Sequence, residues 1–241
     1  MKLWFVAFYV RITEKMIQSK LPGRKHSDST FEGDVAVIVR EIFVKQVYVR
    51  LYRLQNDDIV VDIGARVGLF TLKIAENVKL VLAAEQHPLN HRLLTMNIAF
   101  NKLENVIPVK LALTSYSRKV KLYLRSTATH TLKDQIFGLE PGDALEVRVE
   151  TLDRLIDELR LNKVTFVKID VEGAELDVLK GSQRVLTEND RLFLAIATYH
   201  YSGEALEVAE YLQTKGFKVF TNSKYVYTFK PPDNLGVLLK R

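Results

Sequence analysis

Five side chains that could bind a ligand or move a proton lie at the ends of short apolar segments. They are the acids Asp62, Glu85, Asp170 and Glu172 and the imidazole of His200. In an open parallel sheet, ligands bind outside the carboxyl ends of the strands, where such side chains collect. The pattern therefore predicts a polar site at one sheet edge, with carboxylates and one histidine available for acid–base chemistry.

The segment around Asp62 has the pattern of an apolar strand, a glycine turn and the start of a helix. Gly64 permits a sharp turn, and Gly68 allows a ligand or the sheet to approach the helix backbone closely. A dinucleotide site would carry three glycines for a pyrophosphate, which the carboxylate of Asp62 would repel. That carboxylate suits a cationic amino-acid group instead, and Glu85, about twenty residues on, can accept hydrogen bonds from ribose hydroxyls. Together these features predict S-adenosylmethionine as the cofactor.

The elements that must position these residues alternate between short strands and helices from residue 59 onward. Buried strands joined by helical crossovers are typical of a parallel α/β sheet covered on both faces. The expected strands are Ile59–Ile63, Leu80–Glu85, Val106–Leu111, Phe166–Asp170, Leu192–Ala197, Lys218–Thr221 and Tyr225–Phe229. The expected helices are Leu69–Asn77, Pro88–Asn101, Thr151–Leu161, Ala174–Leu186 and Glu204–Lys215. The link between the last two strands is too short for a parallel crossover, so they must form an antiparallel hairpin.

The pattern divides the chain into an extension, a body and a tail. Residues 1–53 form a basic N-terminal extension of mixed helix, turn and strand, and residues 54–230 form the body. Residues 115–149 interrupt the alternation and are expected to contain an inserted hairpin, and residues 231–241 form a C-terminal tail. Within the extension and its junction with the body, the expected elements are a helix at Trp4–Ser19, a strand at Val35–Val39 and an amphipathic helix at Phe43–Leu54.

Composition excludes several classes of function. The chain has 241 residues, a net charge of +6, a sequence pI near 9.3 and no cysteine. The absence of cysteine removes disulfides, thiolate metal sites and cysteine nucleophiles, including that of cytosine-C5 methylation. Residues 1–53 carry ten Lys and Arg against five Asp and Glu. This asymmetry hints at an anionic partner for the extension, although a solubilising surface is the more common explanation.

Several motifs resemble the FkbM family of class I methyltransferases. They are Asp62-Ile63-Gly64-Ala65-x-x-Gly68-x-Phe70-Thr71, Ala84-Glu85-Gln86-His87-Pro88, Val149-Glu150-Thr151-Leu152-Asp153, and Val167-Lys168-Ile169-Asp170-Val171-Glu172-Gly173-Ala174-Glu175 followed by Leu179-Lys180-Gly181. The resemblance covers roughly residues 43–229 and leaves out the first forty. Arg66 stands where the family often has a smaller or an amide residue. After the fifth strand the family often has an acid shortly before a histidine, and that acid is missing from Ala197-Thr198-Tyr199-His200.

The resemblance implies a Rossmann-like α/β fold with a seven-stranded, mostly parallel sheet whose last strand is antiparallel. It also implies methyl transfer from S-adenosylmethionine, usually to a hydroxyl oxygen of a sugar, a polyketide or another small molecule. The residues that would bind the cofactor are Asp62, Gly64, Ala65, Gly68, Phe70 and Glu85. The catalytic candidates are Asp170, Glu172 and His200.

Methyl transfer to an alcohol needs a base for the hydroxyl proton. Asp170 is the first candidate, either as the base or as an organiser of the sulfonium end, and Glu172 could pair with it or orient the acceptor. An alternative is that Asp170 caps the following helix while Glu172 offsets the helix dipole. His200 suits a base by its near-neutral pKa, but a single histidine is more often structural. Asp170 and Glu172 could ligate a cation, but the sequence shows no dedicated ligand cluster, so no metal is expected.

The preferred function is thus O-methylation of a sugar, a glycolipid or another small molecule. One alternative is an RNA methyltransferase that uses the basic extension, although no separate RNA-binding module is visible. Another is a cofactor-binding protein without catalytic activity, suggested by the missing acid before His200. The expected location is cytoplasmic, since the apolar run Leu3–Val10 is too short to span a bilayer. The acceptor and the oligomeric state are not fixed by the sequence.

Overall fold

The computed structural model describes residues 37–124, 130–131, 144–161 and 163–230. Its contacts divide the chain into two units between Lys45 and Gln46. In the first unit, residues 37–39 are helical and lead into the π-helical turn η1, Arg40–Val44. The strand expected at Val35–Val39 is therefore wrong over residues 37–39, because alternation over so few apolar residues does not distinguish a strand from a helix. The helix expected at Trp4–Ser19 and the tail 231–241 lie outside the described residues.

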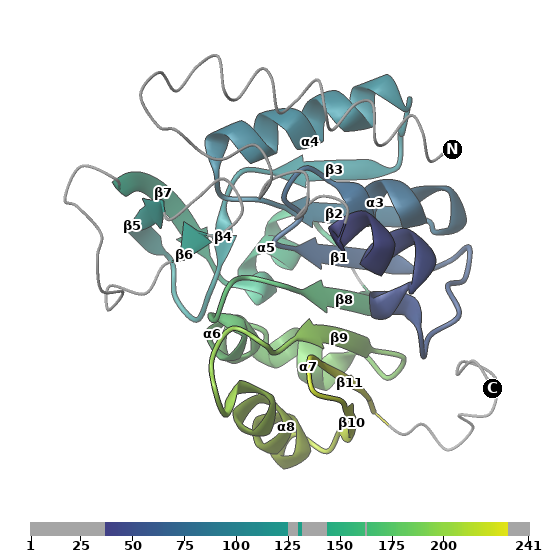
Figure 1. The fold of residues 1–241 in the computed structure, drawn as a ribbon, viewed down its shortest axis with the longest axis vertical. Helices are drawn as coiled ribbons and strands as arrows, with labels where there is room; N and C mark the ends of the chain where they lie inside the picture. The colour runs from purple at the N-terminus through teal and green to yellow at the C-terminus, as the bar shows by residue number, and fades with distance from the viewer. Residues whose placement is uncertain (1–36, 125–129, 132–143, 162, 231–241) are drawn as a thin grey trace. The chain divides into compact units, whose positions relative to one another are not determined.

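The second unit contains a seven-stranded sheet of the expected kind (Figure 1). Its strands are β1 (Ile59–Ile63), β2 (Leu80–Ala84), β3 (Val106–Val109), β8 (Phe166–Ile169), β9 (Phe193–Ala197), β10 (Lys218–Thr221) and β11 (Tyr225–Phe229). The order across the sheet is β10-β11-β9-β8-β1-β2-β3. The strands from β9 to β3 pair in parallel, while β11 pairs antiparallel with both β9 and β10. The mostly parallel sheet with an antiparallel last strand is confirmed.

Helices connect these strands at the expected places. They are α3 (Leu69–Ile74) with the 3-10 turn η3 (Ala75–Asn77), α4 (Pro88–Phe100), α5 (Leu152–Glu158), α6 (Glu175–Lys180), α7 (Gln183–Glu188) and α8 (Glu204–Thr214). The single helix expected at Ala174–Leu186 is two helices, because Gly181 ends α6 at a point where an added Cβ would lie 1.9 Å from the carbonyl oxygen of Thr114. No helix among the described residues is long and apolar enough to cross a membrane.

The helix expected at Phe43–Leu54 is also interrupted. Gln46 adopts a left-handed backbone with φ 50°, and only the 3-10 turn η2 (Val47–Val49) follows it. A non-glycine residue in this region rarely continues a helix. The segment that follows contains two buried tyrosines, Tyr48 and Tyr52.

The alternation of side chains along the strands builds a separate core on each face of the sheet. On one face, a continuous apolar cluster includes Val61, Ile169 and Ile196 and the buried sides of α5, α6, α7 and α8. On the other face, Phe166 stacks with Phe193 at 5.5 Å between ring centroids, and Tyr52 packs against both rings. Both faces are thus covered, so the polar site is confined to the edge where the strands end.

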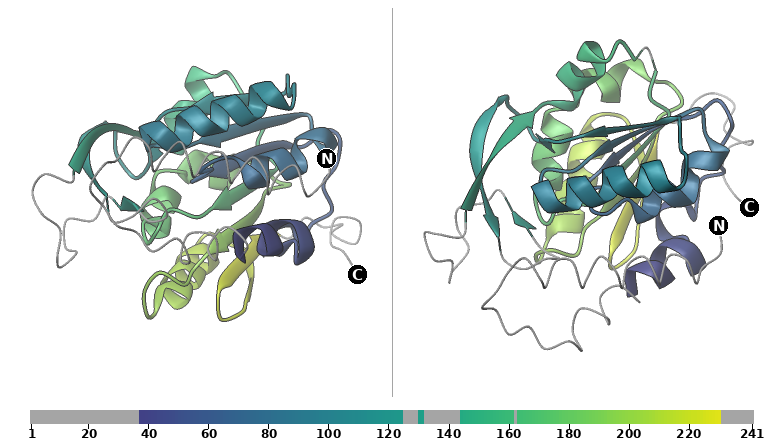
Figure 2. Two further views of the ribbon diagram at one scale, coloured as in Figure 1. Left: turned by 45° about the horizontal axis from the view of Figure 1, so that its top comes forward. Right: turned by 90° about the horizontal axis from the view of Figure 1, so that it is seen from above.

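A second, four-stranded sheet lies beyond the carboxyl ends of the parallel strands (Figures 1 and 2). It contains β4 (Ala112–Leu113), β5 (Arg118–Leu124), β6 (His130–Thr131) and β7 (Ala144–Glu150), in the order β4-β7-β5-β6. Strands β5 and β7 pair antiparallel. This pairing confirms the hairpin expected within residues 115–149.

Candidate functional site

The glycine turn after β1 is fixed by the two neighbouring strands. The backbone N–H groups of Gly64 and Ala65 both donate to the carbonyl oxygen of Ala84, at 3.0 and 2.9 Å. Gly64 has φ 75°, and a Cβ added there would lie 1.9 Å from the carbonyl oxygen of Asp170. Glycine is required here because the end of β8 lies directly against the turn. The predicted cofactor turn and the first catalytic candidate are therefore in contact.

Asp62 lies beneath this turn, completely buried. One carboxylate oxygen is 3.1 Å from the ammonium of Lys168, and the other accepts a 2.7 Å hydrogen bond from the hydroxyl of Thr71. A buried carboxylate is stable only with such partners. The structure thus places Asp62 inside the protein, below the surface that a ligand would contact.

Lys168 joins Asp62 to the turn itself. Its ammonium donates to the carbonyl oxygens of Gly64 at 2.8 Å and Ile63 at 3.3 Å, and it lies 5.4 Å from the ring centroid of Tyr48. Asp62 and Lys168 are directly opposite one another in the β1–β8 pairing. One buried cation therefore holds both the acid and the backbone of the glycine turn.

Glu85 sits at the end of β2 with its carboxylate at the turn. It accepts hydrogen bonds from the backbone N–H of Arg66 at 2.9 Å and of His87 at 2.8 Å, one on each oxygen. Each carboxylate oxygen can accept a further bond, so ribose hydroxyls remain possible partners. Burial raises the pKa of Glu85, and the two backbone N–H groups oppose that shift.

The other three predicted cofactor residues are largely buried. Ala65 and Phe70 are 5% and 4% exposed, and the Phe70 ring packs edge-on against Tyr48 at 5.4 Å. Gly68 begins α3 with φ 88°, and an added Cβ would meet the side chain of Leu94 on α4. The close approach that Gly68 permits is thus to a neighbouring helix of the protein.

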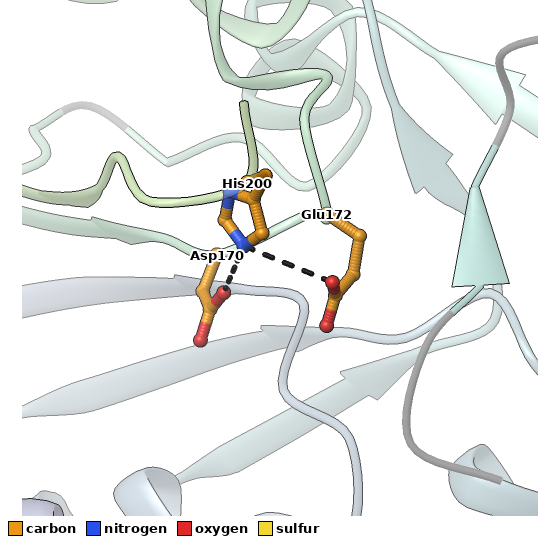
Figure 3. A group of neighbouring side chains, drawn as sticks. All are labelled: Asp170, Glu172 and His200. Atoms are coloured by element: carbon orange, nitrogen blue, oxygen red, sulfur yellow. Dashed lines mark ion pairs between the residues drawn. The ribbon is translucent and has the colours of Figure 1, made fainter. Parts of the chain in front are cut away.

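The three catalytic candidates meet at the carboxyl ends of β8 and β9 (Figure 3). Nε2 of His200 lies 3.4 Å from Oδ1 of Asp170 and 3.8 Å from Oε2 of Glu172. Oδ2 of Asp170 accepts a 2.7 Å hydrogen bond from the hydroxyl of Tyr48. Side chains from adjacent strands thus converge on one imidazole nitrogen.

The opposite nitrogen of His200 is held by two further acids. Nδ1 lies 3.2 Å from Oε2 of Glu204 and 3.3 Å from Oε1 of Glu175. The same oxygen of Glu204 accepts the backbone N–H of His200 at 2.9 Å, and that of Glu175 accepts the N–H of Val171. These bonds fix the imidazole plane and join the loops after β8 and β9.

The surroundings of Asp170, Glu172 and His200 give these three side chains different pKa values. Burial alone would raise the pKa of Asp170, but the contact with His200, the charge of Lys168 and the Tyr48 hydroxyl lower it to about 2. Burial and the nearby charge of Asp170 raise the pKa of Glu172 to about 7. Burial would lower the pKa of His200, but Asp170, Glu204 and Glu175 raise it to about 10. Near neutral pH, Asp170 is ionised, His200 is protonated and Glu172 titrates.

The loop after β8 argues against the capping alternative. Helix α6 begins after Ala174, which is the N-cap and makes no side-chain capping bond. Asp170 instead pairs with Tyr48 and His200, and Glu172 takes a left-handed backbone with φ 59°. Such a conformation is uncommon outside glycine and is often found at functional sites.

Four residues of this site escape prediction from the sequence. Glu175 stands within the quoted run around Asp170, and Glu204 follows His200 by one helical turn, so both were visible as acids near candidates. Lys168 lies in the same run, but its pairing with Asp62 depends on the register of β1 and β8, which the sequence does not predict. Tyr48 carries no signal, since it lies 122 residues from Asp170.

The chain matches a family profile and known proteins that are described as methyltransferases. Residues 62–219 match a family profile described as the methyltransferase FkbM domain. The chain is 30% identical over 214 residues to methyltransferase sdnD of Sordaria araneosa, covering 76% of this chain and 82% of the relative. It is 27% identical over 153 residues to hexuronic acid methyltransferase AglP of Haloferax volcanii, covering 61% and 60% of the two chains.

A solved structure shares the fold. The crystal structure of an FkbM methyltransferase from Methylobacillus flagellatus KT superposes with a TM-score of 0.57 at 19% identity. The match covers 92% of this chain and 58% of that one, so the chain spans less than two thirds of that protein's length.

Proposed function

The chain belongs to the FkbM methyltransferase domain family, and from this we propose that it transfers the methyl group of S-adenosylmethionine to a hydroxyl oxygen of a sugar, a glycolipid or another small molecule. The observation that carries the proposal is the contact between the glycine turn and the acid cluster. The backbone of Asp170 touches Gly64, and the N–H of Asp170 donates to the carbonyl oxygen of Ile63. A cofactor at the turn would therefore have its reactive end beside Asp170, Glu172 and His200.

The cofactor is assigned to the turn through two kinds of residue. Glu85 offers carboxylate lone pairs to the ribose hydroxyls, and Gly64 and Ala65 shape the backbone against which the cofactor lies. Asp62 and Phe70 support the turn from below without touching the cofactor, since both side chains are buried in contacts with other protein residues. Gly68 is the point at which α3 and α4 approach each other.

The transfer itself is a direct displacement at the sulfonium carbon. The acceptor oxygen attacks the methyl carbon, the carbon–sulfur bond breaks, and S-adenosylhomocysteine leaves. The protein must orient the two reactants and receive the hydroxyl proton. Glu172 is proposed as the base, because its pKa of about 7 lets it accept a proton near neutrality. Asp170, ionised at this pH, stabilises the positive charge of the sulfonium group. The protonated His200 orients the carboxylates of Asp170 and Glu172.

The acceptor class rests on a relative and on the site's chemistry. One relative is a hexuronic acid methyltransferase, so a hydroxyl on a sugar is the acceptor we propose first. A base with a pKa near 7 suits an alcohol, whose proton must be removed as the oxygen is methylated. The inserted sheet β4–β7 lies beyond the same strand ends and is proposed to bound the acceptor side.

The test is an acceptor screen with the full chain. The protein is incubated with S-adenosylmethionine carrying a labelled methyl group and with glycan extract, lipid extract or total RNA. Label is expected in the glycan or lipid fraction, and mass spectrometry should find products heavier by one CH2. Glu172→Gln should abolish transfer while retaining cofactor binding by calorimetry, whereas the exposed Glu104→Gln should behave as the parent protein. Label only in RNA would contradict the proposal, as would cofactor binding without transfer to any fraction.

A further inference from the structure

We propose that Asp170, Glu172 and His200 form a binding site for a divalent first-row transition-metal ion. The ion would hold the acceptor oxygen during the methyl transfer, a role that rests on the function proposed above. The sequence predicts no metal, because it shows no dedicated ligand cluster. The fold brings the three side chains together from the ends of adjacent strands, β8 and β9.

The positions of the three donor atoms fit one ion. The distances from Nε2 of His200 to the carboxylate oxygens are 3.4 and 3.8 Å, and the three donor atoms all lie within 4.8 Å of one another. For metal–ligand bonds of about 2.1 Å, adjacent ligands of a six-coordinate ion are about 3 Å apart and opposite ones about 4.2 Å. The two distances from Nε2 lie between these values, so one ion can bind all three groups after small side-chain adjustments.

Nε2 of His200 is an independent indication of a ligand. The His200 side chain is only 7% exposed, and Nε2, which lies 3.4 Å from Oδ1 of Asp170, makes no hydrogen bond of good geometry among the described residues. It points between Asp170 and Glu172 (Figure 3). A buried ring nitrogen without a hydrogen bond is costly, whereas a bound cation would satisfy it.

The remote side of the ring has the arrangement expected of a metal-binding histidine. Nδ1 lies 3.2 Å from Oε2 of Glu204, which also accepts the backbone N–H of His200. Metal-bound histidines commonly donate the other ring N–H to a carboxylate, which fixes the ring and its tautomer. Glu204 is thus assigned as a positioning residue for the ion's histidine ligand.

The charge around the imidazole also favours a cation. Four carboxyl groups, those of Asp170, Glu172, Glu175 and Glu204, lie within 4 Å of the ring nitrogens. One imidazolium faces these acids, and burial together with a side-chain hydrogen bond to Glu204 raises the pKa of Glu175, so not all four carboxyls carry a charge. A divalent ion would replace the His200 proton and balance the acids better.

The donor set restricts the kind of ion and of acceptor. Two carboxylates and one imidazole suit Mn²⁺, Fe²⁺ or Zn²⁺ better than Ca²⁺, which prefers oxygen alone. Three protein ligands leave positions on a six-coordinate ion for two oxygens of the acceptor. The acceptor class that fits best therefore has adjacent oxygens, such as a vicinal diol or a hydroxyl beside a carboxylate.

The ion would work together with Glu172 during the transfer. A hydroxyl bound to a divalent cation loses its proton more readily. The second oxygen of Glu172 is turned away from His200 in Figure 3 and can receive that proton. The acceptor oxygen then forms its bond to the methyl carbon as the carbon–sulfur bond breaks. Charge and atoms balance, and no redox change of the ion is needed.

The experiment measures Mn²⁺ binding to the full chain, without S-adenosylmethionine or acceptor, by loss of the aqueous Mn²⁺ signal in electron paramagnetic resonance. One ion per chain is expected. Glu172→Gln and Asp170→Asn should each weaken binding at least tenfold, and Glu204→Gln should weaken it about 10–100-fold through loss of histidine positioning. Glu76→Gln, an exposed acid in η3, is the matched control and should bind as the parent protein does.

Thermal unfolding of each variant verifies that it is folded, and an Mn²⁺-induced rise in Tm gives a second reading for the parent protein and the control. Absence of saturable Mn²⁺ binding would overturn the ion site, as would equal affinity in Glu172→Gln and Glu76→Gln. Full methyl transfer after EDTA treatment would overturn the ion's role and leave the proposed methyl transfer intact. Specific Mn²⁺ binding without transfer to any acceptor would leave the ion site standing and contradict the proposed function.

Discussion

The hydroxyl of Tyr48 donates a 2.7 Å hydrogen bond to Oδ2 of Asp170, across 122 residues of sequence. The Tyr48 ring also packs edge-on against Phe70 and Tyr225. One side chain of the segment before β1 therefore touches the acid cluster and the aromatic core beneath the glycine turn. The contact joins this segment to the candidate acid cluster, although no motif in the segment indicates such a contact.

Replacing Tyr48 with phenylalanine should lower the rate of methyl transfer while preserving the ring packing. A hydrogen bond to a charged acceptor contributes about 1.5–3 kcal/mol, so urea unfolding should show a loss of that order. Tyr52→Phe is the matched control, because the Tyr52 hydroxyl donates to Asp58, at the opposite end of β1. It should lose comparable stability but keep its transfer rate. Equal loss of rate in both variants would contradict a specific role for Tyr48.

Gly64→Ala should damage cofactor binding and stability together. The new Cβ would lie 1.9 Å from the carbonyl oxygen of Asp170, at a position that also has φ 75°. Gly203→Ala is the control, since Gly203 has φ 90° but nothing within 4 Å of the added Cβ. The control should lose only the backbone cost of about 1–2 kcal/mol and retain binding. Calorimetry with S-adenosylmethionine and urea unfolding measure both effects. Normal binding by Gly64→Ala would refute the role of the turn.

Lys168→Met should destabilise the protein by about 3–5 kcal/mol, because Asp62 would remain buried without its cation. Adding Asp62→Asn to this variant removes the uncompensated charge and should recover part of the loss in urea unfolding. Lys168→Arg preserves the charge and serves as the comparison. If the double variant is as unstable as the sum of the two single variants, the pair is not coupled.

The affinity for S-adenosylmethionine should fall on acidification through the raised pKa of Glu85. Burial favours the protonated form of this carboxyl, so it loses its charge at a higher pH than an ordinary glutamate. The protonated form loses lone pairs needed for the ribose hydroxyls, and binding weakens as pH decreases. For stability the sign is opposite: the neutral form is favoured by folding, so the contribution of Glu85 decreases as pH rises through its folded pKa.

Calorimetry between pH 5 and 7.5 measures the first effect. Glu85→Gln should bind more weakly at neutral pH and show a flatter dependence on pH, since it has no carboxyl to titrate. An unchanged affinity in this variant would remove Glu85 from the cofactor site.

The sequence predicts the sheet well because each strand is a short apolar run with a separate turn signal. The hairpin of β10 and β11 followed from the length of one turn alone. The break after Lys180 was missed, since it depends on Thr114, a residue from a distant part of the chain. The residue pattern within a segment predicts its secondary structure. A close approach between two distant segments leaves no such pattern in either of them.

In the candidate site, too, some positions are predictable from the sequence and others are not. The positions of Glu85, Asp170 and His200 at strand ends were predictable from alternation and from the rule that parallel strands share one functional edge. The sequence does not predict that the Asp62 side chain is buried against Lys168. That contact depends on the register of β1 and β8, which places the two residues opposite one another. Glu204, four residues after His200, lies 3.2 Å from Nδ1 of its ring.

The position of β11 limits how the protein can be shortened. This strand lies between β9 and β10 in the sheet, although it follows both along the chain. The family match ends at residue 219, within β10, and begins at residue 62, within β1. A fragment cut at those limits would lack β11, Tyr48 and Tyr52, and would expose the edge of β9 and the ring of Phe193 to water. Such an open, apolar edge favours association between copies, so a minimal active fragment must keep residues on both sides of the match.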